Sequence, residues 1–233
     1  MGRAQRRMLP AILLLGALVL NGCGAQPQAD PNDPLAGTIT ASGSTALLPL
    51  ASIAAEIFAE QHPNVTVNVS GGGSYNGLAQ VASGAVEIGN SDIPATGDLA
   101  EGLVEHKVAI APFVIIAHPE NPVTGLTTDQ LARMVRGEIT NWREVGGSDM
   151  PITVVSRQQS SGSRATIVEK VLGGAGDIAK DAVVQDSNGK VRNTVQYTPG
   201  AIGYIDAAYY QPARVAAVAL DGIEYSMDAV IAG

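Results

Sequence analysis

Four short polar turns carry the residues of this sequence that could do chemistry. They are SGST at residues 42–45, GGGS at 71–74, NSD at 90–92 and RQQSSGS at 157–163. Each turn follows a predicted strand, and three of them run directly into a helical pattern. The N-terminus of a helix presents unpaired N–H groups and the positive end of the helix dipole, so turns of this kind bind anions readily. Together they predict a site for a small tetrahedral oxyanion.

The first two turns supply hydroxyl and backbone donors. Ser44 and Thr45 would donate hydroxyl and N–H groups to the anion, although both residue types are also common helix N-caps. The three glycines before Ser74 let the backbone approach a ligand closely or adopt a positive φ. A tight turn followed by a cap is the alternative interpretation of the glycines.

The last turn combines a cation with further donors. Arg157 could hold two oxygen atoms at once through its planar guanidinium, and a surface salt bridge is its alternative role. Ser161, Gly162 and Ser163 then present hydroxyl and amide donors at the head of the next predicted helix.

Asp92 is the residue that discriminates between anions. A carboxylate repels an anion unless the ligand itself carries a proton to donate. Hydrogen phosphate ions carry such a proton at neutral pH, whereas sulfate does not. We therefore expect phosphate to be preferred, because sulfate would leave two acceptors facing each other without a proton. An aspartate that only stabilises its own turn is the alternative.

Enzymatic and nucleic-acid-binding functions are disfavoured. His62, His106 and His118 are scattered without metal-ligand spacing. The chain has no G-x-S-x-G motif, and the SNGK at residues 187–190 lacks the partner motifs of an S-x-x-K enzyme. We expect no catalytic residue, no metal and no cofactor. The formal net charge of −8 argues against a nucleic-acid partner.

The N-terminal residues have the pattern of a secretion signal. Three arginines precede an apolar run at residues 8–20, which is shorter than the roughly 20 residues of a membrane-spanning helix. The following LNGC resembles a bacterial lipobox. We expect a signal peptide at residues 1–22, lipidation of Cys23 and a flexible tether at 23–36, with an uncleaved anchor as the alternative. Loss of residues 1–22 removes three arginines and no acids, so the net charge would go from −8 to −11.

Hydrophobic periodicity in the remaining chain predicts alternating strands and helices. The expected strands lie at 38–41, 65–70, 86–89, 108–117, 152–156 and 201–205, and the expected helices at 50–58, 75–83, 127–135, 163–172 and from an Asn188 cap onward. This order predicts an α/β protein of two lobes, with mainly parallel sheets flanked by helices and a ligand cleft between the lobes. We expect lobe 1 at 37–116 plus 213–233, lobe 2 at 117–212, and hinges near 114–118 and 206–213.

From about Gly37 onward, the sequence resembles the phosphate-binding proteins of bacterial ABC phosphate-uptake systems, which are class II periplasmic binding proteins. The resemblance rests on SGST, SGGGS, EIGNSD, ITNWREVGG, SRQQSSGSR and PGAIGY. It implies the two-lobed fold. It also implies that phosphate contacts Thr45, Ala46, Ser74, Asp92, Arg157, Ser161, Gly162 and Ser163, with Ser44 adding a hydroxyl.

The resemblance further implies a monomeric, extracytoplasmic, lipid-anchored receptor that passes phosphate to an ABC permease without a chemical reaction. EIGNSDIPA departs from the ending common in the most similar subgroup but keeps the aspartate. Related sequences continue past the point that corresponds to Gly233 with a strand and helices of the first lobe, so the C-terminus looks truncated. The alternatives are a receptor for sulfate or molybdate, a phosphate-sensing lipoprotein and a secreted hydrolase.

Overall fold

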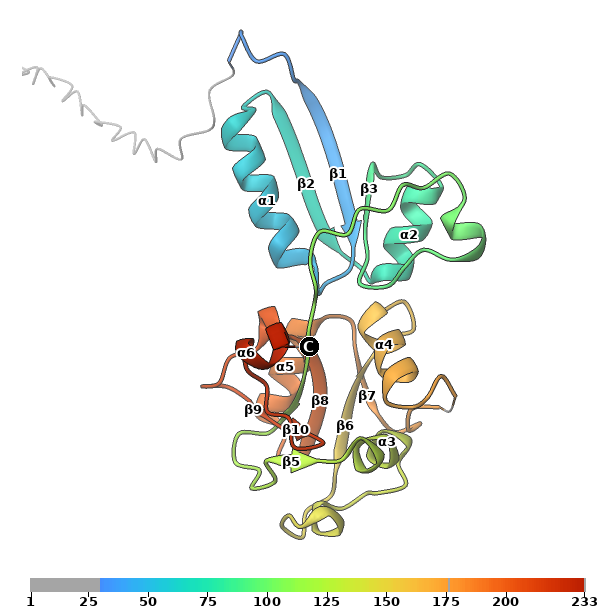
Figure 1. Cartoon of the computed structure of the whole chain (residues 1–233), viewed down its shortest axis with the longest axis vertical. Helices are drawn as coiled ribbons and strands as arrows, with labels where there is room; N and C mark the ends of the chain where they lie inside the picture. Colours follow the sequence, from blue (N-terminus) through green and yellow to red (C-terminus); the bar gives the residue numbers. More distant parts are fainter. Residues whose placement is uncertain (1–29, 176, 233) are drawn as a thin grey trace, which may run out of the picture.

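The structure, a computed structural model, describes residues 30–175 and 177–232 and arranges them in two lobes (Figure 1). The expected signal peptide, Cys23 and most of the expected tether lie outside the described residues. Among the residues that are described, no helix has the length and apolar character needed to cross a membrane.

The first lobe is a three-stranded parallel sheet with two helices. Its elements are β1 (Gly37–Gly43), α1 (Leu48–Gln61), β2 (Val65–Gly71), α2 (Ser74–Ala82), β3 (Ile88–Asn90) and the 3₁₀ helix η1 (Gly97–Ala100). The strand order is β2-β1-β3, and both pairings are parallel. This β-α-β-α-β order is the one that the periodicity predicts.

The second lobe is built on a five-stranded mixed sheet of order β7-β6-β8-β4-β9. Its strands are β4 (Phe113–Ala117), β5 (Gly125–Leu126), β6 (Thr153–Arg157), β7 (Val183–Gln185), β8 (Ala201–Asp206), β9 (Ala216–Ala217) and β10 (Ala219–Leu220). Its helices are α3 (Thr128–Arg136), η2 (Trp142–Val145), α4 (Gly162–Lys170), α5 (Asn188–Tyr197), η3 (Ala207–Tyr209) and α6 (Met227–Ala232). Strand β6 runs parallel to β7 and β8, whereas β4 runs antiparallel to β8 and β9.

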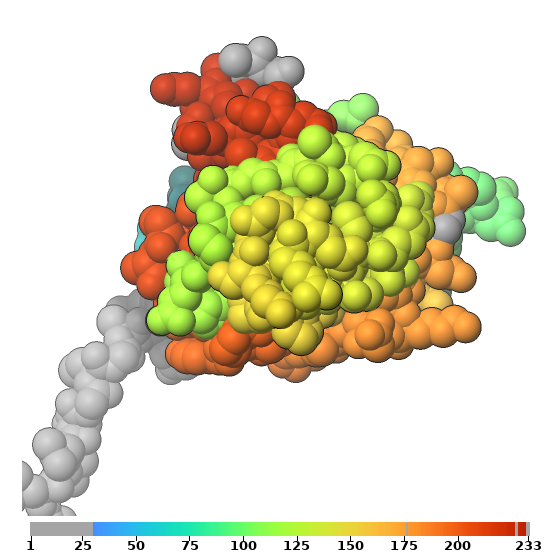
Figure 2. Space-filling view, turned by 90° about the horizontal axis from the view of Figure 1, so that it is seen from below, coloured from blue at the N-terminus to red at the C-terminus, as the bar shows by residue number. Residues whose placement is uncertain are grey.

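Apolar side chains cover both faces of this larger sheet. Along β4, Ile115 and Ala117 join the cluster that contains Trp142, while Val114 and Ile116 join the cluster on the other face. Successive side chains of a strand point to opposite faces, so both faces must be covered to bury all four residues. Figure 2 shows the outer end of this lobe, where α3 and η2 form most of the surface, in yellow-green and yellow.

The predicted strand at 108–117 is too long. Only Phe113–Ala117 pairs in the sheet, and Val108 and Ile110 are 66% and 90% exposed. The preceding segment instead carries the chain from the first lobe to the second (Figure 1). An apolar run does not form a strand where no neighbouring strand accepts its backbone hydrogen bonds.

The C-terminal strands pair with the second lobe. Ala216–Ala217 pairs with β4, and Ala219–Leu220 pairs with β5 in a separate two-stranded sheet. The sequence predicts that residues 213–233 belong with the first lobe, and it predicts a hinge near 114–118, which falls inside the paired strand β4. The free edge of β4 offers backbone hydrogen-bond partners to β9, which accounts for the different placement.

Candidate anion-binding site

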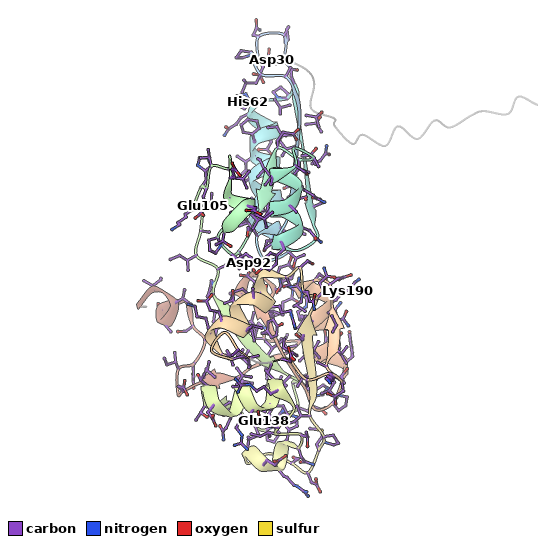
Figure 3. All side chains as sticks on the ribbon, turned by 90° about the vertical axis from the view of Figure 1, so that its right-hand side faces the viewer. Asp30, His62, Asp92, Glu105, Glu138 and Lys190 are labelled. Atoms are coloured by element: carbon purple, nitrogen blue, oxygen red, sulfur yellow. The ribbon has the colours of Figure 1, made fainter. Side chains whose placement is uncertain are left out.

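The polar turns of the first lobe leave its sheet at one edge. Gly43 aligns with Gly71 on one side and with Asn90 on the other, so β1, β2 and β3 all end together. In the second lobe, the parallel strands β6 and β7 also end together, at the aligned residues Arg157 and Gln185. Asp92 lies where the two lobes meet (Figure 3). The turns that the sequence singles out therefore converge on the junction between the lobes.

Asp92 accepts hydrogen bonds from both lobes. Its Oδ1 accepts from the hydroxyl of Ser74, and its Oδ2 accepts from Ser163 Oγ at 3.1 Å. Gly162 packs against the same carboxylate, because a Cβ atom there would lie 2.0 Å from Asp92 Oδ1. Both serines are buried. These four predicted site residues are thus brought together across the junction.

Arg157 is a buried cation with unused donors. It ends β6, is 1% exposed, and donates one hydrogen bond of 3.0 Å from Nη2 to the carbonyl of Asp186. Its Nε and Nη1 atoms are buried without a hydrogen-bond partner. Burial lowers the pKa of Arg157 from its ordinary value, and the nearby Tyr204 and Asp92 oppose this shift. Buried polar groups are rarely left unpaired, so these N–H groups are suited to an anionic ligand.

Thr45 connects the first lobe to the second through two hydrogen bonds. Its Oγ1 accepts from Asn188 Nδ2 at 3.0 Å, and its carbonyl accepts from the Tyr209 hydroxyl at 2.8 Å. Thr45 itself is buried and precedes α1 by one turn. Both contacts hold Thr45 against the second lobe.

Two of the predicted hydroxyls also serve their own turns. Ser44 Oγ accepts from the backbone N–H of Ala46 at 3.1 Å, and Ser161 Oγ caps α4 by accepting from the N–H of Arg164 at 3.2 Å. A hydroxyl that accepts a hydrogen bond keeps its own proton as a donor. Among the hydrogen bonds of the described residues, none joins the side chain of Ser44 or the backbone of Ala46 to the second lobe.

Sequence reasoning missed the role of Asn188 and gave no signal for Tyr209. The predicted cap at Asn188 is wrong, because Ser187 is the N-cap of α5 and its hydroxyl accepts from the N–H of Lys190 at 3.3 Å. Asn188 is fully buried and faces Thr45. The available signal was that Ser187 and Asn188 are both good N-cap residues and only one of them can cap the helix. The prediction from sequence assigned the cap to Asn188 instead of Ser187.

Comparison with known proteins defines the class. The PBP superfamily domain matches residues 28–231. The phosphate-binding protein PstS of Bacillus subtilis is 39% identical over 94% of this chain and 77% of the relative. The chain therefore belongs to the PBP superfamily and, within it, to the family that contains PstS, as the sequence resemblance predicts.

Two solved structures share this fold. One is a phosphate-bound substrate-binding protein from Clostridium perfringens, assigned to phosphate ABC transport; it is 34% identical with a TM-score of 0.79, and the match covers 84% of this chain and 81% of that one. The other is an ABC-type phosphate transport receptor from Vibrio cholerae, 32% identical with a TM-score of 0.64, over 82% of this chain and 79% of that one.

Proposed function

We propose that this protein is an extracytoplasmic receptor that binds inorganic phosphate and delivers it to an ABC-type import permease. The observation that carries the proposal is Arg157, a buried guanidinium with two unpaired nitrogen donors close to the Asp92 carboxylate. A cation in this state is stabilised by an anion that accepts from both donors. The Bacillus subtilis relative is named as a phosphate-binding protein, and the names of the Vibrio cholerae and Clostridium perfringens proteins support the transport role.

Asp92 supports phosphate over sulfate. An ionised carboxylate offers about four acceptor positions on its two oxygens. Ser74 and Ser163 occupy one position on each oxygen, so capacity is left for a protonated oxygen of the ligand. Hydrogen phosphate can donate that proton, whereas sulfate would place an unprotonated oxygen against the carboxylate.

Closure of the two lobes on the ligand is the functional motion in this proposal, and no covalent step is part of it. Donors from both lobes would contact the same anion, namely Ser44, Thr45, Ala46 and Ser74 from the first lobe and Arg157, Ser161, Gly162 and Ser163 from the second. A ligand favours the closed state when it binds that state more tightly, and contacts from both lobes supply the difference in free energy.

We infer a lipid anchor at Cys23 that leaves the site accessible. The first described residues dock at the tip of the first lobe, where the N–H of Asp30 donates to Asn64 Oδ1 at 3.1 Å and His62 contacts Asp33 at 3.2 Å. Asp30 and His62 lie at the end of that lobe opposite Asp92 (Figure 3). A tether leaving from this tip would join a monomer to the membrane without crossing the cleft.

Calorimetric titration of the chain without residues 1–23 tests the proposal. We expect one phosphate to bind per chain near neutral pH, with no heat from sulfate. Binding of sulfate or molybdate in place of phosphate would show a receptor for another oxyanion. A folded protein that binds none of these anions would contradict the proposal.

A further inference from the structure

Asn188 bridges the two lobes at the anion site. It is the first residue of α5 and is 0% exposed. Its Nδ2 donates to Thr45 Oγ1 in the first lobe at 3.0 Å, and its Oδ1 accepts from the backbone N–H of Asp206 in the second lobe at 2.9 Å. In Figure 3, Lys190 of the same helix marks the edge of the second lobe that faces the first.

The bond to Asp206 fixes the orientation of the Asn188 amide. A backbone N–H can only donate, so the amide oxygen must face Asp206 and the NH₂ group must face Thr45. The reverse orientation would place two donors against each other and leave both unpaired inside the protein. The direction of the hydrogen bond between Asn188 and Thr45 is therefore set by the fold.

This direction determines what the Thr45 hydroxyl can do. Because Oγ1 accepts from Asn188, the hydroxyl hydrogen must point away from Asn188 and can be donated to another group. The Tyr209 hydroxyl meanwhile holds the carbonyl of Thr45 at 2.8 Å and fixes the backbone of this turn. When the second lobe lies against the first, these two contacts therefore orient Thr45 and leave its hydroxyl hydrogen free to be donated.

We propose that Asn188 is a positioning residue of the anion site, which makes the Thr45 hydroxyl a donor to bound phosphate and couples that role to closure of the lobes. The inference rests on the proposed phosphate-receptor function and goes further by naming a residue that acts through Thr45. Asn188 is not required to contact the anion itself.

A double-mutant cycle tests this role. Phosphate affinity is measured by calorimetry for the wild-type chain, Asn188→Ala, Thr45→Val and the double variant. Loss of one hydrogen bond to a charged ligand corresponds to about tenfold weaker binding. We expect Asn188→Ala to weaken binding by about tenfold in the wild type and to have little further effect after Thr45→Val. A purely structural role would give the same loss in both backgrounds and would overturn the inference.

A second variant keeps the test decisive if Asn188→Ala unfolds. Asn188→Asp preserves the acceptor for the backbone N–H of Asp206. Its carboxylate would, however, accept a hydrogen bond from the Thr45 hydroxyl, which reverses the direction of the bond found in the wild type. We expect phosphate affinity to fall by at least about tenfold, and unchanged affinity would contradict the inference. Asn193→Ala, on the exposed face of the same helix, is the matched control and should bind phosphate normally. If the wild-type chain itself binds no phosphate, the proposed function fails, and this inference fails with it.

Discussion

The backbone N–H of Tyr75 donates a 3.1 Å hydrogen bond to the carbonyl of Ser160. This bond joins the first turn of α2 in the first lobe to the loop between β6 and α4 in the second. Gly73 packs against the same loop with φ +100°, and a Cβ atom there would lie 2.5 Å from the Ser160 carbonyl oxygen. The glycine turn and the Ser160 loop therefore close against each other only while residue 73 has no side chain.

Gly73→Ala should prevent full closure. Its Cβ would clash with backbone, and its positive φ adds about 1–3 kcal/mol of strain, so we expect phosphate affinity to fall by at least about tenfold. Small-angle scattering with phosphate should show a less compact particle than the wild type. Gly72→Ala is the matched control, since a Cβ at that position meets no atom within 4 Å. Equal affinities for the two variants would contradict the role of this contact.

Asp92→Asn should change anion selectivity. The amide keeps the size of the side chain but loses the charge and one acceptor, so phosphate should bind at least about tenfold more weakly and sulfate should become a detectable ligand. Competition calorimetry with both anions measures the change. Asp98→Asn removes the same charge at an exposed position of the same lobe and should leave selectivity unaltered. Unchanged rejection of sulfate by Asp92→Asn would remove Asp92 as the selectivity residue.

Arg157→Met should separate stability from binding. Replacing a buried, incompletely paired cation by an apolar side chain is often neutral or stabilising by about 1–4 kcal/mol. We therefore expect an equal or higher free energy of unfolding in urea without phosphate, together with loss of at least about a hundredfold in phosphate affinity.

The exposed Arg143 provides the control for this variant. Its side chain is 65% exposed and pairs with Asp149 at 3.5 Å, so Arg143→Met should change neither stability nor affinity by much. Strong destabilisation of the ligand-free Arg157→Met protein would show that Arg157 is structural. Retained phosphate affinity would show that its free donors do not face the ligand.

Local sequence patterns were sufficient for the parts of this protein that local chemistry determines. Alternating valines predict β2, and the capping box at Thr127 and Gln130 predicts the start of α3, where the structure shows both of its hydrogen bonds. The glycine turn before Ser74 and the turn containing Asp92 follow strands that end together. Their convergence follows from parallel pairing, which the β-α-β order predicts.

Contacts between distant segments could not be read from the sequence. Asn188 and Thr45 are 143 positions apart, and Tyr209 and Thr45 are 164 positions apart. Nothing in the local sequence of α5 shows that its first turn meets the first lobe. The placement of β9 depends in the same way on which strand edge is free, a property of the folded sheet rather than of the two alanines.

Asp206 makes stability depend on pH. Burial raises its pKa, the N–H of Ala208 opposes the shift, and Asp92 adds to it. Because the folded-state pKa is raised, this carboxyl stabilises the fold fully below its unfolded pKa of about 3.9, and the contribution is lost as pH rises through the folded pKa. Asp206→Asn keeps the acceptor for Ala208 and cannot ionise. In the absence of phosphate, the Tm of Asp206→Asn should therefore rise relative to that of the wild type as the pH increases from about pH 4.

Differential scanning calorimetry of both proteins across that range checks the sign. Asp98→Asn serves again as the control for removing one negative charge from an exposed position. The Tm of Asp206→Asn could differ from that of the wild type by the same amount as the Tm of Asp98→Asn does at every pH. That result would show that ionisation of Asp206 does not destabilise the folded state. A difference that decreases as the pH rises would reverse the assigned sign, and would mean that the folded protein stabilises the Asp206 carboxylate more than burial destabilises it.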